Sequence, residues 1–356
     1  MYKLSPSGGR CRAATASKHG NHNYTTLEHL MHTPTTYVGI DISKAKLDVA
    51  LYHDDVLKAE TITVACDRRG LLALRRWLHQ ATTDRPLLIG MEATGAYWQP
   101  VAASLHASGA RVYVLNPRCV KDSARAENQR QKTDRVDAGV IARHLRAHCA
   151  KLHPWTPPTP AVATLRALLT RWDQLGQELQ REYNRRADVH EPLVHASFRR
   201  MIRFLLHERR TIRTALDQHC TAAAELHNAV DAVAAEPGIG LLSAMRLVAL
   251  MRTHTFTTAR QAAAFLGITP RHCESGTSLK RPPRISRVGD AALRHALFFP
   301  AVVARHHHPV LKPWADGLVA RGKTPKQAAC AVMRRIVHIA FGIVKRIDRE
   351  QPLLAA

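Results

Sequence analysis

Four prolines fall within the short stretch "LHPWTPPTPA", at residues 152–161. Proline lacks a backbone N–H and its ring fixes φ, so neither a helix interior nor a central strand can run through this stretch. Upstream, short apolar runs alternate with segments of helical spacing, whereas downstream we find helical spacing joined by basic connections. The stretch therefore predicts a linker at residues 151–160 between an α/β domain and a helical region.

The upstream segment alternates strands with helices. Two apolar runs, 37–42 and 47–52, are joined by a short polar turn and predict a β-hairpin. The leucine spacing of "RRGLLALRRWLHQA" predicts a helix, and "RPLLIGMEATG" and "ARVYVLNP" predict strands on either side of a glycine-capped helix. This order predicts an α/β sheet over residues 36–150. Residues 1–35 are expected to be a disordered arm or a mis-annotated start, with Met31 directly before the first strand.

Two apolar stripes with helical spacing follow the linker. The first contains Leu165, Leu168, Trp172, Leu175 and Leu179, and the second, after a break near Pro192, contains Ile202, Leu205, Ile212 and Leu216. They predict two long helices in a coiled-coil region over residues 161–230, folded on each other or on a second protomer. A helical hairpin without a role in oligomer formation explains the stripes equally well.

Residues 231–350 combine short helices with basic connections, which predicts a mainly α C-terminal domain. Within it, "PGIG" resembles the turn of a helix-hairpin-helix motif. Gly238 and Gly240 would permit positive φ there and present backbone N–H groups to a nucleic-acid phosphate. Any tight turn between two helices can use glycine in the same way, so both explanations remain open.

A basic loop is predicted at residues 271–287. Its cations, which could hold a DNA backbone, are Arg271, Lys280, Arg281, Arg284 and Arg287. Ser275, made accessible by Gly276, lies among them and could attack phosphorus. From the residues alone, a loop whose serines only hydrogen-bond to phosphate is the better explanation. The three histidines at 306–308 are predicted to be surface or phosphate contacts, because consecutive histidines do not suit a tetrahedral metal site.

The net charge favours a polyanionic partner. Lys and Arg total 52 against 28 Asp and Glu, a formal charge of +24, and the basic residues are spread along the chain. Nucleic acid is therefore expected as the partner, and an anionic membrane is not. No apolar run is expected to span a bilayer, and "IVHIAFGIV" is too short. Seven cysteines without a C-x-x-C pair favour a reducing cytoplasm over a disulfide framework or a zinc site.

Four carboxylates stand at the ends of predicted elements. Asp41 interrupts an apolar strand, Glu92 lies near the end of a later strand, and Asp134 with Asp137 begins a helix. Sites in open α/β sheets collect where strands end, so the acids could converge, and Mg²⁺ would relieve their repulsion while clamping a phosphate. Plainer explanations exist. A helix N-terminus favours acids through its dipole, and Glu92 could be an exposed strand-end residue.

The segments "GIDISKAKLDVAL", "GMEATGAYW" and "KTDRVDA" resemble the three motif segments of the DEDD transposases of insertion sequences. The resemblance extends over residues 36–345 and implies an RNase H-like (RuvC-like) fold for 36–150 and a transposase domain for 231–350. It also implies a set of metal-binding catalytic acids, which would be Asp41, Glu92, Asp134 and Asp137. The cofactor would be Mg²⁺, with two ions in the site and Mn²⁺ as an alternative.

The segments "TPRHCESGTS" and "RISRVGDAALRHAL" are similar to the C-terminal part of the same family. The similarity implies that Ser275 is the nucleophile, with Ser278 as a close neighbour of the same type. Asp290 departs from the family's usual Asn, which leaves a polar contact at that position in doubt. Donor and target DNA, a structured guide RNA and a homo-oligomer, dimer or tetramer, are implied as partners, with a composite site across protomers. The resemblance also implies a bacterial-type protein at the nucleoid.

Three other functions remain open. A metal-dependent nuclease of the same fold would use water as nucleophile and leave Ser275 structural. An actin-like or sugar-kinase-like ATP-binding protein also begins with "GIDIS", although its Gly-rich phosphate loops are not found after residue 150. A non-catalytic nucleic-acid scaffold would rely on the helix-hairpin-helix alone.

Overall fold

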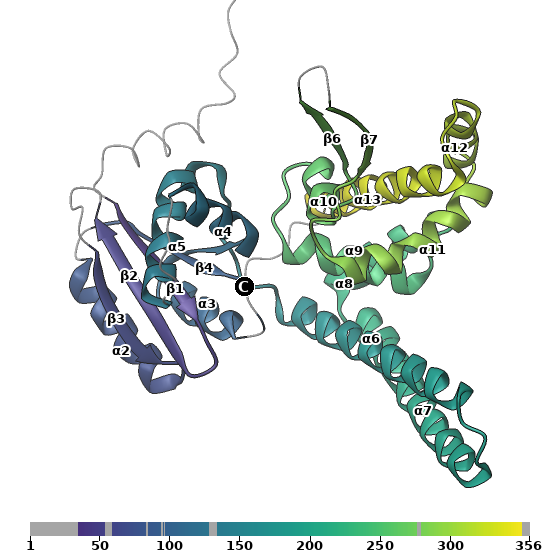
Figure 1. The fold of residues 1–356 in the computed structure, drawn as a ribbon, viewed down its shortest axis with the longest axis horizontal. Coiled ribbons are helices and arrows are strands. Elements are labelled where there is room, and N and C mark those ends of the chain that lie inside the picture. Colours follow the sequence, from purple (N-terminus) through teal and green to yellow (C-terminus); the bar gives the residue numbers. More distant parts are fainter. Residues whose placement is uncertain are drawn as a thin grey trace, which may run out of the picture. The chain divides into compact units, whose positions relative to one another are not determined.

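The computed structural model describes residues 35–53, 59–82, 85–93, 95, 97–127, 134–275 and 279–350, and their side chains except at 134–135, 272–275 and 279–283. The chain divides into two compact units, Met1–Thr156 and Pro157–Ala356, and the division falls within the proline-rich stretch (Figure 1). The predicted N-terminal arm at residues 1–35 lies, except for Thr35, outside the described residues.

The first unit is built on a mixed five-stranded sheet in the order β3-β2-β1-β4-β5. Its strands are β1 (Thr36–Ile42), β2 (Lys46–His53), β3 (Glu60–Ala65), β4 (Leu87–Glu92) and β5 (Arg111–Leu115). The first three are joined as antiparallel neighbours, and β1, β4 and β5 run parallel. The predicted β1–β2 hairpin and the two later strands are confirmed.

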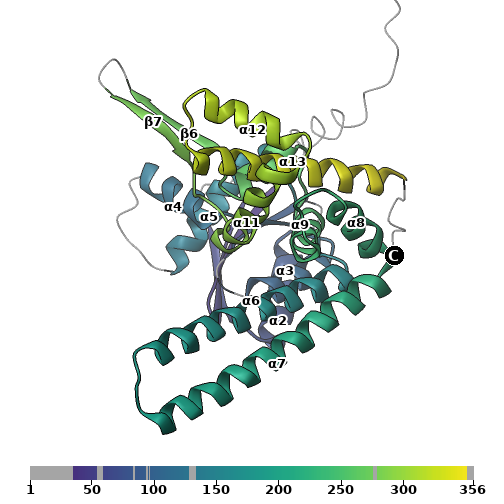
Figure 2. The ribbon, with the colours of Figure 1, turned by 90° about the vertical axis from the view of Figure 1, so that its right-hand side faces the viewer.

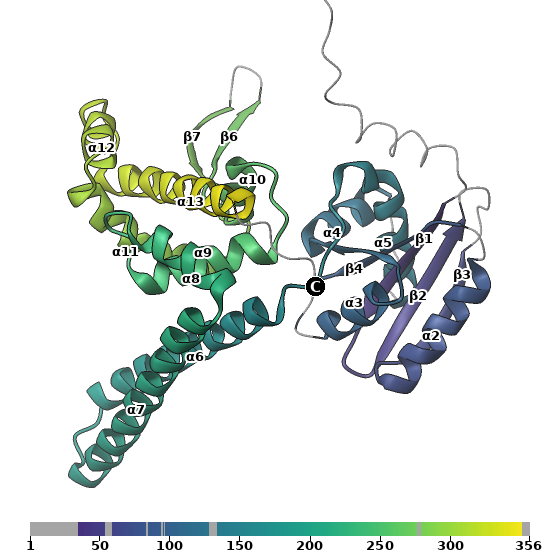
Figure 3. The same cartoon turned by 180° about the vertical axis from the view of Figure 1, so that it is seen from behind.

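Apolar side chains cover both faces of this sheet. Val38 and Ile40 share a buried cluster with Leu74 of α2 (Arg68–Ala81) and with residues of α3 (Trp98–His106). On the opposite face, Tyr37 belongs to a cluster with residues of α4 (Pro117–Ala126) and α5 (Asp134–His148). Helices on both faces explain why the strands are almost continuously apolar (Figure 3). The arrangement is the RNase H-like one that was expected.

Among the described elements of this unit, one strand and one α-helix were not predicted. Strand β3 lies at the edge of the sheet, and each of its residues is at least partly exposed, so its apolar signal is weak. Helix α4 contains a single buried residue, Val120, and packs on α5. Both elements are stabilised by packing on an adjacent element, β2 for β3 and α5 for α4, and have no strong apolar pattern of their own, which is why local spacing did not reveal them.

The second unit is mainly helical. Its helices are α6 (Pro160–Ala187), α7 (Pro192–Ala222), α8 (Ala224–Ala234), α9 (Leu241–Thr253), α10 (Ala259–Phe265), α11 (Ala291–His307), α12 (Leu311–Ala320) and α13 (Pro325–Glu350). One apolar core extends from Val162 in α6 to Val344 in α13. The N-caps of α10 and α11, Thr258 and Asp290, accept hydrogen bonds from the backbones of Gln261 and Leu293.

Helices α6 and α7 lie side by side as a long hairpin (Figure 2). A separate small cluster, formed by Leu175, Leu179, Ile202 and Leu205, holds the part of the hairpin beyond the main core. These are residues of the two predicted apolar stripes, so the two long helices are confirmed, and within the chain they fold on each other.

Helix α13 has the length and the composition of a membrane-crossing helix, which we had not expected of any segment. Eight of its residues are buried, and it packs against α8 to α12. Its apolar character is therefore accounted for by its central place in the core of this unit.

The segment predicted as a basic loop is instead a β-hairpin of β6 (Pro270–Ser275) and β7 (Leu279–Ile285). The segment contains two prolines and many cations, which are unfavourable in a central strand. A sheet of only two strands consists of edges, where proline does not have to supply a ladder N–H.

Candidate active site

Three carboxylates occupy neighbouring positions on three adjacent strands. In the antiparallel ladder, Asp41 of β1 is the partner of Asp48 of β2. In the parallel ladder, Ile40 is the partner of Met91, so Asp41 and Glu92 each follow one residue later. Residues paired in this way point to the same face and are about 5 Å apart. The three acids therefore form a row at the carboxyl ends of β1 and β4.

Helix α5 covers the face that carries this acid row. A Cβ atom at Gly39 would lie 2.0 Å from the carbonyl oxygen of Ala138, so only glycine permits this approach of strand and helix. Tyr37, at the other end of β1, belongs to the same buried cluster as Leu145, near the end of α5. The first turn of α5 therefore lies toward the acid row.

Asp134 is the first residue of α5, and Asp137 follows one turn later and is half-buried. Asp41 and Glu92 are also half-buried, and each has a polar interaction with the rest of the chain. Among the described side chains, which exclude that of Asp134, no three Asp, Glu, His or Cys residues come close enough to hold a metal ion. The backbone thus brings the predicted acids to one end of the sheet, and a shared ion stays a prediction.

Asp48 was not predicted as a site residue. The residue is only 3% exposed, and its side chain accepts a hydrogen bond of 2.6 Å from the hydroxyl of Thr63 and forms an ion pair of 2.9 Å with Lys46. A buried carboxylate is costly without such partners. The signal was present in the sequence, because a hairpin of strands 37–42 and 47–52 pairs position 41 with position 48.

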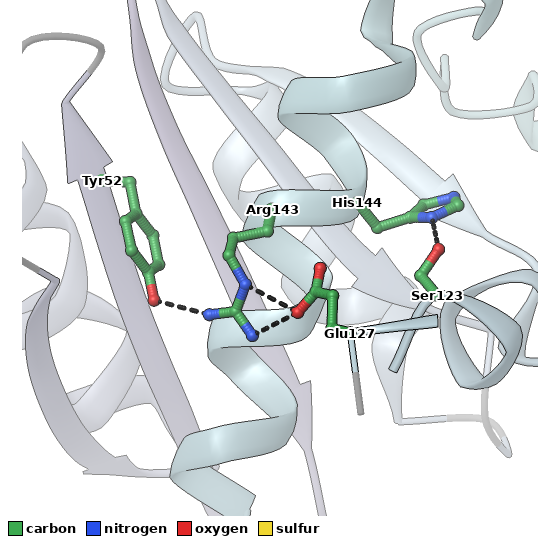
Figure 4. A network of polar contacts seen from close by, with 5 residues as sticks. All are labelled: Tyr52, Ser123, Glu127, Arg143 and His144. Atoms are coloured by element: carbon green, nitrogen blue, oxygen red, sulfur yellow. Dashed lines mark hydrogen bonds and ion pairs between the residues drawn. The ribbon is translucent and has the colours of Figure 1, made fainter. Parts of the chain in front are cut away.

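Arg143 fixes α5 against its neighbours (Figure 4). Its guanidinium donates two hydrogen bonds, of 2.9 and 2.8 Å, to one carboxylate oxygen of Glu127 at the end of α4. A third hydrogen bond, of 2.8 Å, goes to the hydroxyl of Tyr52 on β2. One planar cation thereby joins a helix end, a strand and the helix that begins with Asp134.

His144, the next residue, makes a second link between α4 and α5 (Figure 4). One of its ring nitrogens lies 2.6 Å from the hydroxyl of Ser123, and the ring stacks on His148 with centroids 4.4 Å apart. Burial lowers the pKa of His144, and the neighbouring His148 lowers it further. A neutral ring in a hydrogen bond indicates a structural role for His144.

Ser275, the predicted nucleophile, is the last residue of β6, and its ladder partner is Leu279. The hairpin extends away from α10 and α13 (Figure 1). Exposed Arg271 and Arg284 are ladder partners, so two like charges face each other. The side chains of Ser275 and of two further predicted cations, Lys280 and Arg281, lie outside the described residues.

The predicted helix-hairpin-helix turn connects α8 to α9. Gly238 has a φ of +88°, and a Cβ atom there would lie 2.8 Å from the backbone of Ala304 in α11. This glycine is therefore required for the turn and for helix packing. Gly240 has a φ of −71°, so the positive φ considered for both glycines occurs only at Gly238 of the two. Gly240 is exposed and has open space beside it, and a phosphate contact there stays a prediction.

The prediction of surface contacts at residues 306–308 is wrong for His308. This residue is buried, and its Nδ1 accepts hydrogen bonds of 3.1 Å from the backbone N–H groups of Val310 and Leu311. Its Nε2 lies 3.4 Å from the carboxylate of Glu236. His308 thus accepts hydrogen bonds from backbone N–H groups at the start of α12, which have no partner within the helix. A run of three histidines did not indicate this capping role.

Two segments of the chain match families of known proteins. Residues 38–189 match the IS110 type of DEDD transposase, described as "Transposase", and residues 231–315 match "Transposase IS116/IS110/IS902 family". Together these segments contain Asp41, Glu92, Asp134 and Asp137 on one side and Ser275 on the other. They are transposase families and not the ATP-binding kinases that the first hairpin also resembles.

The chain is also similar to individual proteins over most of its length. The pilin gene-inverting proteins of Moraxella bovis and Moraxella lacunata are each 29% identical over 318 residues, which cover 87% of this chain and 96% of theirs. An uncharacterized 43.6 kDa protein of insertion element IS110 from Streptomyces coelicolor is 29% identical over 134 residues, 37% of this chain and 33% of that protein. The chain belongs to the IS110 family of DEDD transposases, enzymes whose substrate is DNA.

Proposed function

We propose that this transposase cuts and rejoins DNA strands by attack of Ser275 on phosphorus, assisted by divalent metal. The metal would be held by Asp41, Glu92, Asp134 and Asp137. The observation that carries the proposal is the acid row across β2, β1 and β4, next to the first turn of α5. Carboxylates on adjacent strands repel one another, and an arrangement of this kind is expected where a cation is bound.

The chemistry of the donor set fits Mg²⁺. All four proposed ligands are carboxylates, and Mg²⁺ prefers hard oxygen ligands, with Mn²⁺ as an alternative. When bound, the metal supplies positive charge that stabilises the attacking and leaving oxygens of a phosphate. Asp48 is not included, because Thr63 and Lys46 already engage its carboxylate. Its proposed task is to keep β2 in register beside Asp41.

The proposed serine step forms one bond from oxygen to phosphorus for each such bond that it breaks. The Oγ atom of Ser275 would bond to phosphorus while the bond from phosphorus to the 3′ oxygen of the strand breaks. The proton lost by the serine hydroxyl is balanced by the proton that the released 3′ oxygen gains. The 3′ hydroxyl of another strand then attacks the phosphoserine and restores Ser275. Each phosphodiester broken is replaced by an ester, so the exchange requires no ATP.

The same exchange of strands would serve insertion of an element and inversion of a segment. The Moraxella relatives are named for inverting a pilin gene. Either process requires the protein to hold two DNA sites. The net charge of +24 is suited to two duplexes together with a structured guide RNA, which we include in the proposal.

Association of protomers is proposed through the α6–α7 hairpin. Large apolar side chains are exposed on α7, among them Leu193 at 80%, Phe204 at 57% and Met201 at 48%. Exposed apolar groups gathered on one helix favour contact with another protein surface. A dimer or tetramer would then supply the copies of the active site that two DNA sites require.

The test is recombination between donor and target plasmids in a heterologous host that also carries the non-coding DNA flanking the gene. Wild type should recombine and should form a protein–DNA adduct that survives denaturation. Asp41→Ala and Ser275→Ala should both lose recombination, and Ser275→Ala should lose the adduct. Ser278→Ala is the matched serine control, and Asp122→Ala, at an exposed acid of α4, is the matched acid control.

Recombination by Ser275→Ala at the wild-type level would contradict the serine step and favour a water-using nuclease or transposase. Recombination that persists without the flanking non-coding DNA would contradict the guide RNA only. Loss of activity in Asp122→Ala would mean that the acid substitutions act through folding. These outcomes therefore test the serine step, the guide RNA and the role of the acids separately.

A further inference from the structure

A cavity of about 760 Å³ opens in the second unit at the base of the β6–β7 hairpin. Helices α10, α12 and α13 form its walls, and Pro270 and Ile285, at the two ends of the hairpin nearest the core, complete it. This volume lies in the range of about 300 to 1,000 Å³ that is usual for small-molecule and cofactor sites. The cavity is therefore large enough for a ligand of nucleotide size.

The charge of the cavity has one sign. Its cationic side chains are Arg260, Arg284, Arg287, Lys323, Lys326, Arg334 and Arg335, and no Asp or Glu is among the described residues that line it. Elsewhere in the unit, arginines are paired with acids, as Arg252 is with Asp348 at 2.8 Å. None of the cavity cations has an ion pair with a described carboxylate. Seven cations without a carboxylate partner among the described residues repel one another, so the cavity is suited to an anion.

The backbone near the cavity also indicates a ligand. Arg287 has a φ of +57°, a left-handed conformation that is uncommon for a residue with a Cβ atom. Its N–H donates a 2.9 Å hydrogen bond to the carbonyl of Gly267, and its side chain lines the cavity. Arg284 lies opposite Arg271 in the ladder, where like charges destabilise the pairing. Both features cost stability in the free protein, which is expected where binding of an anion compensates.

Part of the cavity lining is apolar and includes an aromatic ring, and we call this part, formed by Trp314, Leu318 and Ile285, the floor. The guanidinium of Arg335 lies 4.9 Å from the centre of the Trp314 ring. A phosphate backbone makes ionic and polar contacts, so it does not by itself account for an apolar part of the lining. A base can stack on an aromatic side chain or an arginine plane only when it is not stacked in a duplex.

We propose that this cavity binds one unpaired nucleotide of the DNA strand. Its base would lie on the apolar floor, and its phosphates would contact the cations that line the cavity. DNA is the partner chosen because β6 leads from the cavity to Ser275, where a DNA strand would be attached. Pro270 and Ser275 are five residues apart, or about 16 Å in a strand. The captured nucleotide would thus lie a few positions from the reacting phosphate.

This inference deepens the proposed function by naming a DNA feature that the transposase recognises. Its test measures binding without cleavage. We would use single-stranded DNA of about 12 nucleotides with a central 2-aminopurine, the same strand in a duplex, and RNA of the same sequence. Anisotropy gives the affinity for the full chain, and quenching of 2-aminopurine reports stacking. Single-stranded DNA should bind more tightly than the duplex, and its fluorescence should be quenched.

Two variants test the cavity. The double variant Lys323→Gln/Lys326→Gln removes two exposed charges of the cavity lining. It should weaken binding of single-stranded DNA about tenfold and make the affinity less dependent on salt concentration. Trp314→Leu keeps an apolar floor and should remove most of the quenching. The matched control is Lys345→Gln/Arg346→Gln, which removes the same charge elsewhere on α13, and it should weaken binding less than threefold.

Equal losses in the cavity and control variants would overturn the proposal, because the cavity would then contribute only general charge. Effects confined to RNA would overturn the choice of DNA. If Trp314→Leu unfolds, the exposed double variant and its control still decide the question. An inactive serine leaves every one of these binding results unchanged, so failure of the serine mechanism is distinguishable from failure of this proposal.

Discussion

The acid row and the basic cavity differ in whether their charged side chains have partners within the described part of the chain. In the acid row, Asp48 is satisfied by Thr63 and Lys46, and Asp41 and Glu92 also have polar interactions within the chain. In the cavity, the cations have no described acidic partner. The acid row therefore has partners within the sheet, which suits the proposed site for a small ion, whereas the proposed nucleic acid would compensate the cations of the cavity.

The largest effect that separates the two regions is expected from Asp41→Asn. The substitution preserves the shape of the side chain and removes one of the adjacent like charges. Strand exchange should fall by about a thousandfold or more, since removal of a member of a catalytic unit has effects of this size. The midpoint of thermal unfolding should not decrease, because repulsion along the row is relieved. Recombination frequency and calorimetry on one preparation measure both quantities. A large loss of stability would assign Asp41 a structural role.

A smaller effect, on stability, is expected from Gly39→Ala. The new methyl group would collide with the carbonyl oxygen of Ala138, so strand β1 and helix α5 must separate. We expect a loss of about 3 kcal/mol in the free energy of unfolding, together with weaker activity, because α5 carries Asp134. Gly342→Ala in α13, where no atom lies within 4 Å of the added methyl, is the control and should stabilise the protein slightly. Equal behaviour of the two variants would refute the close packing of α5.

The stability of the second unit is expected to depend on pH through His254. Burial, together with the nearby Arg166, lowers the pKa of His254 to about 4. The unfolded chain binds this proton at a pH near 6.5, so stability is complete above that pH and is lost as the pH falls toward 4. The loss should be at most about 3 kcal/mol. His254→Phe, which keeps a ring beside Phe265, should remove this pH dependence in denaturant titrations at pH 7 and pH 4.5. An unchanged pH dependence would assign it to other groups.

The smallest effect is expected from Thr63→Val, which removes the hydroxyl that donates to Asp48 while preserving the shape of the side chain. Leaving a buried carboxylate with one donor fewer should cost about 1 to 2 kcal/mol. Thr61→Val, two residues earlier on the same strand, is the control and should change stability by less than about 0.5 kcal/mol. If the two variants are equally stable, water or another donor replaces the hydroxyl, and the compensation of charge in the acid row is less rigid than inferred.

Local interactions account for what could be predicted from the sequence. The β1–β2 hairpin, the two long helices and the caps at Thr258 and Asp290 depend on residues within a few positions of one another. The placement of the four acids at element ends could also be predicted, because Asp41 interrupts an apolar strand, Glu92 ends one, and Asp134 with Asp137 begins an apolar helix. Even the missed Asp48 followed from the hairpin register, since the turn alone decides that it lies beside Asp41.

Tertiary structure decided the remaining features. The residues that line the cavity lie between positions 260 and 338 and come from three helices and a hairpin, so no spacing rule connects them. The β6–β7 strands form although prolines and repeated cations argue against them, and His308 is buried only because α11 turns into α12 beside Glu236. A charge or an aromatic ring has the same local signal whether it faces water or a cavity. Its surroundings are set by the packing of distant elements, and only the folded chain reveals them.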